Sequence, residues 1–218
     1  MLTQDVRDKI KNITSGAVIN GQPGHCTAIR NLLCSRYPPD RTVKTNFEGK
    51  SVTKEEQSAL IASYCDEHNL WMQPPGDYLT RGGEARVYLD PDAMDVIKVN
   101  GGVYYATWLE FFNSILLHNV LFENTAYTLI GFYREEGQIY AMLKQPYVEC
   151  NRTVEIAEIK TFLEFNGFIN TRRQDYVNKE LGLILEDMHD ENVLLCDGLL
   201  FFVDSVFYVI EPDMEPIE

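Results

Sequence analysis

The chain has 218 residues, of which 45% are hydrophobic and 24% charged. This composition excludes a disordered chain and indicates a folded protein with one sizeable core or two small ones. A formal net charge of −14 argues against binding to nucleic acid or to an anionic membrane through broad electrostatic attraction.

No apolar run reaches the length of about 18 residues that a membrane span needs. The first residues, Met1 to Asp5, lack the basic start and apolar run of a signal peptide. The cysteines are odd in number and widely spaced, and no CxxC pair occurs among them: Cys26, Cys34, Cys65, Cys150 and Cys196. We therefore expect a cytoplasmic protein with reduced thiols.

Residues 1–74 predict a small, mainly helical segment that ends near a Pro-Gly joint. One helix is expected over Gly24–Tyr37, and a second is signalled by a capping box from Thr53 to Glu56. The polar stretch between them reads as a loop with a candidate strand at Thr42–Phe47. No catalytic motif occurs here. We expect this segment to brace the part that follows, and the alternative is that it binds a partner.

A glycine pair lies between the first two of three strands, which are expected over residues 78–81, 86–90 and 95–99. Without a Cβ, Gly82 and Gly83 would let backbone N–H groups come close to phosphate oxygens. Lys98 on the third strand would then supply a positive charge to the phosphates. The full G-x-G-x-x-G pattern is absent, so an ordinary hairpin with an exposed Lys98 is the alternative.

A long helix is predicted from Val103 to Phe122, rich in aromatic residues and leucine. Glu110 is its one acid before the far end. A carboxylate on an apolar face is costly unless a cation meets it, and Lys98 is the obvious partner. The alternative is that Glu110 points to solvent.

A hairpin follows, with strands over 127–134 and 138–143 joined across Glu135–Gly137. Another helix is expected over Val154–Phe165, with a solvated face of acids and Lys160. The side chains expected to point inward from it are Ile156, Ile159, Phe162 and Leu163.

The most informative pattern is D-x-x-x-x-N followed by a second aspartate, formed by Asp187, Asn192 and Asp204. Asp187 could accept a proton from a hydroxyl, and the other two could hold a divalent cation on ATP phosphates. The turn Asp197-Gly198 favours a hairpin between the last two strands. The strands expected around this motif are 181–185, 193–196 and 199–203. A capped surface loop is the alternative.

Taken together, these segments resemble the kinase-like domain of bacterial polyvalent proteins, which are modules of phages and other mobile elements. The wording around Asp187, His189 and Asn192 is also similar to aminoglycoside phosphotransferases. The resemblance covers about residues 76–210. The segments that carry it are Gly82–Tyr88, Val96–Asn100, Leu117–Tyr127, Leu143–Val148, Leu185–Leu194 and Phe201–Asp204.

The resemblance implies an α+β, two-lobed, protein-kinase-like fold that binds ATP and Mg²⁺ in a cleft. The helical segment 1–74 would precede an N-lobe over 75–146 and a minimal C-lobe over 147–218. By the same mapping, Asp187 is the catalytic base, Asn192 and Asp204 are metal ligands, Gly82, Gly83 and Lys98 bind phosphate, Glu110 orients Lys98, and Gln145 and Tyr147 lie in the hinge strand whose backbone meets adenine. His189 is expected to be buried and bonded to backbone, holding the loop rather than moving a proton.

Several residues depart from the protein-kinase pattern. Leu185 and Glu186 stand where His and Arg usually precede the catalytic aspartate, and Ser205 stands where Phe follows the metal aspartate. Few residues follow Asp204, so we expect no activation segment. The prediction is an ATP- and Mg²⁺-dependent phosphotransferase whose acceptor is an unknown protein or small molecule. The alternatives are a nucleotide-binding pseudokinase and a non-catalytic interaction protein.

Overall fold

The structure is a computed structural model that describes residues 2–21, 24–38, 47–74, 77–83, 85–91, 94–150 and 153–210, with side chains left out at 47–52. The chain forms two compact units of mixed helix and sheet. Unit 1 comprises Met1–Ser15, Asn113–Thr125 and Val148–Glu218, and unit 2 comprises Gly16–Phe112 and Ala126–Tyr147. The expected α+β class is confirmed. No helix in the described ranges is long and apolar enough to cross a membrane.

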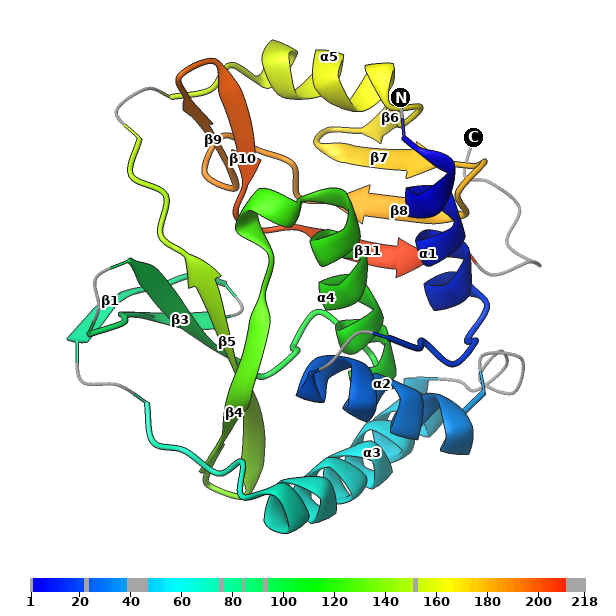
Figure 1. The fold of residues 1–218 in the computed structure, drawn as a ribbon, viewed down its shortest axis with the longest axis vertical. Helices are drawn as coiled ribbons and strands as arrows, with labels where there is room; N and C mark the ends of the chain where they lie inside the picture. Colours follow the sequence, from blue (N-terminus) through cyan, green and yellow to red (C-terminus); the bar gives the residue numbers. More distant parts are fainter. Residues whose placement is uncertain are drawn as a thin grey trace. The chain divides into compact units, whose positions relative to one another are not determined.

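Unit 2 is built on a five-stranded antiparallel sheet in the order β1-β2-β3-β5-β4 (Figure 1). The strands are β1 (Asp77–Arg81), β2 (Ala85–Leu89), β3 (Asp95–Asn100), β4 (Thr128–Glu135) and β5 (Gln138–Pro146). All three strands expected around the glycine pair and the expected hairpin are present. The turn from β4 to β5 places Glu136 at φ 50° and Gly137 at φ 81°, which is the geometry of a tight hairpin turn.

Both faces of β3 are covered. Ile97 and Val99 on one face form a buried cluster with Met142 of β5. Side chains alternate along a strand, so Lys98 lies on the other face, directly opposite Leu143. The same register puts Gln145, the partner of Val96, on the Lys98 face.

Two helices of the N-terminal segment belong to unit 2, namely α2 (His25–Arg36) and α3 (Phe47–His68). Helix α2 agrees with expectation, whereas α3 begins before the predicted start at Thr53. Thr53 and Glu56 therefore lie within the helix and not at its start. Contacts of Lys54 and Gln57 with other parts of unit 2 hold the turn to which they belong. The candidate strand at 42–47 lies outside the described residues except for Phe47, which starts α3.

Helix α4 spans Trp108–Leu121 and does not begin at Val103 as predicted. The chain first turns after β3, where Asn100 Oδ1 accepts a hydrogen bond from Gly102 N at 2.6 Å. Gly102 has φ 62°, a value that favours glycine. A capping box between Thr107 and Glu110 then starts the helix.

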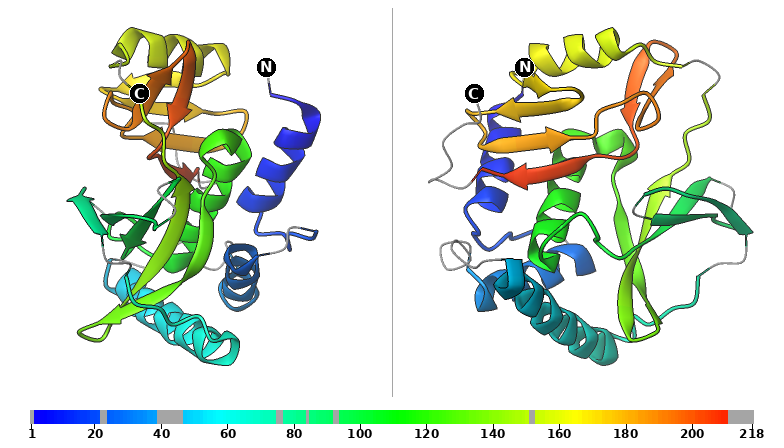
Figure 2. Two further views of the ribbon diagram at one scale, coloured as in Figure 1. Left: turned by 60° about the vertical axis from the view of Figure 1, so that its left-hand side comes forward. Right: turned by 180° about the vertical axis from the view of Figure 1, so that it is seen from behind.

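Unit 1 contains a four-stranded antiparallel sheet in the order β11-β8-β7-β6 and the separate hairpin β9-β10, which can be followed in Figure 2. Its elements are α1 (Gln4–Thr14), η2 (Glu123–Thr125), α5 (Ile156–Phe165), β6 (Ile169–Arg172), β7 (Asp175–Asn178), β8 (Leu183–Glu186), β9 (Val193–Cys196), β10 (Leu199–Phe202) and β11 (Val206–Val209). The strands expected around the D-x-x-x-x-N motif are confirmed, with Asp197 and Gly198 at positive φ between β9 and β10. No sequence pattern predicted α1, β6, β7 or β11.

The expected inward face of α5 is half right. Ile159 and Leu163 are buried, but Ile156 and Phe162 are each 40% exposed. Phe162 lies against Phe202 with ring centroids 5.4 Å apart, so one edge of its ring packs and the rest meets solvent. Helical periodicity identified the centre of the buried face correctly and overestimated its width.

The expectation that all five thiols are reduced is wrong for two of them. Cys150 and Cys196 form a disulfide with Cα atoms 5.5 Å apart, within the usual range. They are 46 residues apart in the sequence, and their proximity comes from the folding of unit 1. Cys26, Cys34 and Cys65 are free and buried, and burial raises the pKa of Cys26 and of Cys65 to about 12, which makes them poor nucleophiles.

Gly131 in β4 provides a test of the packing in unit 2. A Cβ on Gly131 would lie 2.6 Å from the backbone oxygen of Leu70 and 2.6 Å from Met72 Sδ. We expect Gly131→Ala to lower the free energy of unfolding by about 1–3 kcal/mol, because backbone cannot move aside as a side chain can. Denaturant unfolding measures this. Gly82→Ala is the control, since nothing lies within 4 Å of a Cβ there, and equal unfolding curves for the two variants would contradict the assigned packing.

Candidate functional site

Asp187 and Asn192 are brought together by the short loop after β8. The amide nitrogen of Asn192 donates to the Asp187 backbone oxygen at 2.9 Å and to Asp187 Oδ2 at 3.0 Å. The same nitrogen lies 3.1 Å from His189 Nε2, so the NH₂ end of the Asn192 amide faces Asp187 and His189 and its oxygen points the other way. Asp187 has φ 65°, a left-handed conformation that aspartate tolerates better than most residues. Its side chain is 55% exposed and accessible to a second reactant.

His189 also contacts this pair. Its Nδ1 accepts a hydrogen bond from the Glu191 backbone N–H at 3.2 Å. Nε2 lies 3.3 Å from Asp187 Oδ1. His189 is bonded to backbone as expected, but it is half-buried rather than buried. Its contacts orient the Asp187 carboxylate.

Asp204 is tied to Asn192 through the backbone. The Asn192 carbonyl accepts hydrogen bonds from Val203 N at 2.9 Å and from Asp204 N at 3.4 Å. The hairpin β9-β10 thus returns the chain to the loop from which it started. An amide oxygen and a carboxylate are hard ligands that suit Mg²⁺, which usually takes one or two carboxylates and completes its shell with water and phosphate. Among the described residues no cluster of three or more His, Cys, Asp or Glu side chains could hold a metal by itself.

A buried polar network supports the segment after Asp204, and sequence reasoning missed it. His118 Nε2 lies 3.0 Å from the Thr125 carbonyl, so it donates there, and Nδ1 accepts from the Ser205 hydroxyl at 2.7 Å. Ser114 Oγ accepts from Phe207 N at 2.9 Å. Polar residues within an apolar helix were the available signal. Ser205, which departs from the kinase pattern, is therefore hydrogen-bonded within this buried network.

In unit 2, Lys98 is only 8% exposed. Its Nζ lies 3.3 Å from the Tyr127 hydroxyl and 5.4 Å from the centre of that ring. Lys98 does not project into bulk solvent on the far side of its strand. The ammonium group is therefore buried on the sheet face that Lys98 shares with Gln145.

Glu110 lies in the first turn of α4. Its Oε2 accepts hydrogen bonds from the backbone N–H groups of Ala106 at 2.8 Å and Thr107 at 3.3 Å. In return, Glu110 N donates to Thr107 Oγ1 at 3.2 Å. Glu110 was expected to be a carboxylate on an apolar face, and its capping role was not predicted. The sequence Thr107-Trp-Leu-Glu110 has the form of a capping box and signals that role.

The glycine pair joins β1 to β2, and Gly82 N donates to the Ala85 carbonyl at 3.0 Å. A Cβ on Gly83 would lie 2.3 Å from the Tyr104 hydroxyl. The Tyr104 hydroxyl therefore occupies the space that a side chain at position 83 would need. The hydroxyl is the far end of a half-exposed side chain.

The predicted hinge residues lie at the end of β5. Gln145 is buried, and Tyr147 is 48% exposed. The backbone N–H of Tyr147 donates to the Met94 carbonyl at 2.9 Å. That hydrogen bond fixes the course of the chain where β5 ends.

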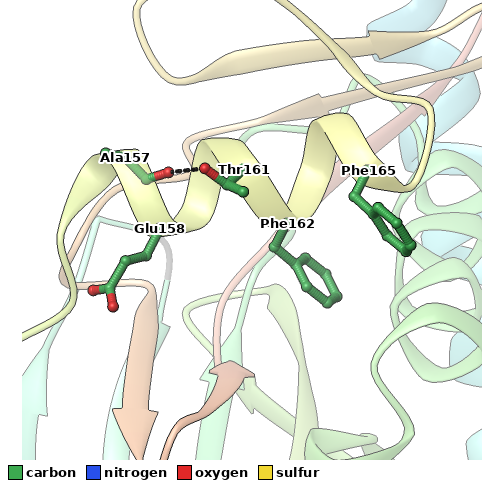
Figure 3. Close-up of a pocket in the computed structure, with 5 residues that line it drawn as sticks. All are labelled: Ala157, Glu158, Thr161, Phe162 and Phe165. Carbon is green, nitrogen blue, oxygen red and sulfur yellow. Dashed lines mark hydrogen bonds between the residues drawn. The ribbon is translucent and has the colours of Figure 1, made fainter.

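A shallow pocket with a volume of about 490 Å³ lies on α5 and includes none of the predicted site residues. It is lined by Ala157, Glu158, Thr161, Phe162 and Phe165. In Figure 3 the two phenylalanine rings project to the same side of the helix, while the Thr161 hydroxyl turns back to the Ala157 carbonyl at 2.7 Å.

The described site residues thus form two groups. Asp187, Asn192 and Asp204 are linked in unit 1, and Lys98, Glu110, Gln145 and the glycine pair belong to unit 2. A carboxylate held by a hydrogen bond from Asn192 can accept a proton, and the neighbouring amide and carboxylate oxygens can bind a cation.

Comparison with known families gives one match. The family model described as serine/threonine/tyrosine kinase found in polyvalent proteins matches residues 54–211. No curated protein matches the chain. The matched range covers every predicted site residue and also takes in most of α3.

Glu186, next to Asp187, gives a pH-dependent prediction. Burial, followed by the charges of Asp175 and Asp187, raises the pKa of Glu186. A carboxyl group with a raised pKa favours folding below its unfolded pKa, and this contribution is lost as pH rises through the folded value. We expect Glu186→Gln to raise the Tm at pH 7 and to leave it nearly unchanged in acid, where Glu186 is protonated. Thermal unfolding at both pH values checks this, with Glu191→Gln as an exposed control. An equal Tm for Glu186→Gln and wild type at pH 7 would contradict it.

Proposed function

Because the chain belongs to the serine/threonine/tyrosine kinase family found in polyvalent proteins, we propose that it binds Mg-ATP and transfers the γ-phosphoryl group to a hydroxyl. The acceptor is a protein or a small molecule. The observation that carries the proposal is the loop in which Asn192 bonds Asp187 through its side chain and residues 203 and 204 through its carbonyl.

In this proposal Asp187 is the general base. Its carboxylate is oriented by Asn192 on one oxygen and by His189 on the other. The acceptor oxygen attacks the γ-phosphorus while its proton passes to Asp187. The bond from phosphorus to the bridging oxygen breaks, and ADP leaves with that electron pair. Asn192 and Asp204 would hold Mg²⁺, which supplies charge neutralisation on the phosphates when bound.

Unit 2 would contribute the nucleotide-binding groups. We assign Lys98 to the phosphates and Glu110 to its orientation, with one Glu110 oxygen committed to the start of α4. The glycine turn would cover the phosphates once the Tyr104 hydroxyl moves from Gly83. The end of β5, at Gln145 and Tyr147, would present backbone groups to adenine.

A pseudokinase is the second candidate, and Glu186 is the observation that favours it. An acidic residue beside Asp187 adds negative charge where an anionic nucleotide must react. Burial, followed by the charges of Asp175 and Asp187, raises the pKa of Glu186. A thermal shift with ATP and Mg²⁺ separates binding from no binding. A ligand at 100 times its Kd stabilises a fold by about 2.7 kcal/mol. No shift at millimolar nucleotide would favour the interaction protein.

The metal assignment is tested by Asp204→Asn. Loss of the carboxylate should abolish the Mg²⁺-dependent part of ATP binding, because a neutral amide is a much weaker ligand for a hard cation. Stability without ligand should barely change. Calorimetric titration with ATP in the presence and absence of Mg²⁺ measures the Mg²⁺-dependent and the Mg²⁺-independent affinity. An unchanged Mg-ATP affinity would refute the assignment.

The base assignment is tested by ATP turnover in wild type, Asp187→Ala and His189→Ala. A general base contributes about 10²–10⁴-fold to rate and little to ground-state affinity. Asp187→Ala should therefore lose turnover while binding Mg-ATP within a few-fold of wild type. His189→Ala should lose less, since it acts on the orientation of Asp187.

Two results would change these conclusions. Equal turnover in wild type and Asp187→Ala would exclude Asp187 as the base. Turnover absent from all three proteins, with nucleotide still bound, would identify a pseudokinase.

A further inference from the structure

We propose that α3 is a built-in clamp on the first turn of α4, and that its residues Lys54, Gln57 and Ser58 position Glu110 for nucleotide binding. The inference rests on the proposed function, in which Glu110 orients Lys98. It assigns a role in that site to a helix that carries no catalytic motif.

The three side chains share one face of α3, since positions three and four apart in a helix are neighbours. Ser58 Oγ accepts a hydrogen bond from the Trp108 indole at 2.8 Å and donates to the Lys54 carbonyl at 2.9 Å. The hydroxyl is thereby satisfied on both sides. Trp108 is the first residue of α4 and is 2% exposed, so this contact fixes where α4 starts.

Gln57 completes the N-terminus of α4 from outside the helix. The first backbone N–H groups of a helix have no partner within it and need one elsewhere. Gln57 Oε1 accepts from the Leu109 N–H at 2.9 Å. Gln57 is fully buried, so water cannot replace the amide oxygen if it is removed.

Lys54 holds the loop that leads into α4. Its Nζ donates to the Gly102 carbonyl at 2.6 Å and to the Tyr105 carbonyl at 2.9 Å. The ammonium group also lies 5.6 Å from the centre of the Trp108 ring. Burial lowers the pKa of Lys54, and the charge of Glu110 acts in the opposite direction. Lys54 is therefore within electrostatic reach of the carboxylate that it positions.

These contacts converge on the backbone that holds Glu110. The Ala106 and Thr107 N–H groups that bind Glu110 Oε2 lie between the carbonyls held by Lys54 and the amide held by Gln57. If the clamp opens, the capping box loses its support, and the backbone N–H groups that hold Glu110 Oε2 shift with the loop. The clamp is thus coupled to the ligand site through one residue.

The decisive experiment is a double-mutant cycle for Mg-ATP affinity, measured by calorimetry on the full chain. The variants are Lys54→Met, Glu110→Gln and the double variant, with Glu55→Gln on the exposed side of α3 as control. Lys54→Met should weaken Mg-ATP affinity about tenfold, which corresponds to about 1.4 kcal/mol. In the Glu110→Gln background the same change should have little effect, because a residue that acts through Glu110 is not additive with it. Glu55→Gln should bind as wild type does.

Hydrogen exchange without nucleotide provides the second measurement. Gln57→Met should speed exchange of the Leu109 amide about tenfold by removing its acceptor, and Glu55→Gln should not. Unchanged exchange in Gln57→Met would overturn the clamp. Unchanged affinity in Lys54→Met, or an equal loss in both Glu110 backgrounds, would also overturn it while leaving the proposed function intact. Wild type that fails to bind Mg-ATP would overturn the proposed function and the clamp together.

Discussion

The start of α4 imposes the constraint on which the predicted nucleotide site of unit 2 depends. The helix is apolar and its first turn is buried, so its free N–H groups must find acceptors that are not water. Gln57 and Thr107 accept from the Leu109 and Glu110 N–H groups. Glu110 in turn binds the N–H groups of Ala106 and Thr107, just before the helix. The residue expected to orient a phosphate-binding lysine is therefore also a structural cap. In the proposed site one carboxylate would serve both purposes, which would link the position of Glu110 to the stability of α4.

The proposed catalytic loop in unit 1, from Asp187 to Asn192, meets a different constraint. A base and metal ligands must be held close together although both carry negative charge. Asn192 contacts the two parts through two different groups. Its side-chain nitrogen bonds Asp187, and its backbone carbonyl accepts from the N–H groups of Val203 and Asp204. The tight turn at Asp197-Gly198 lets β9 and β10 pair without slippage, which is why residue 204 returns to residue 192.

The Cys150–Cys196 disulfide adds a covalent constraint to the same hairpin. It joins the segment after β5 to the end of β9. By loop-closure entropy, a cross-link spanning 46 residues restricts the unfolded chain by about 4 kcal/mol. Such bonds are rare in reducing compartments, so the expected cytoplasmic location stays a prediction.

The sequence by itself determined the features that depend on neighbours along the chain. Alternating apolar residues and turn signals gave the strands from β1 to β5 and β8 to β10, and the short spacing from Asp187 to Asn192 placed those two side chains in one loop. Contacts between distant segments were decided only by the tertiary structure. Nothing local shows that Lys54 and Gln57 meet the start of α4, that Cys150 reaches Cys196, or that Ser205 bonds His118. Helix starts were misplaced for another reason, because a capping pattern marks only a possible start. Thr53–Glu56 lies inside α3, whereas α4 begins at the capping box of Thr107 and Glu110 rather than at Val103. Which of several local patterns starts a helix depends on the packing of the folded chain.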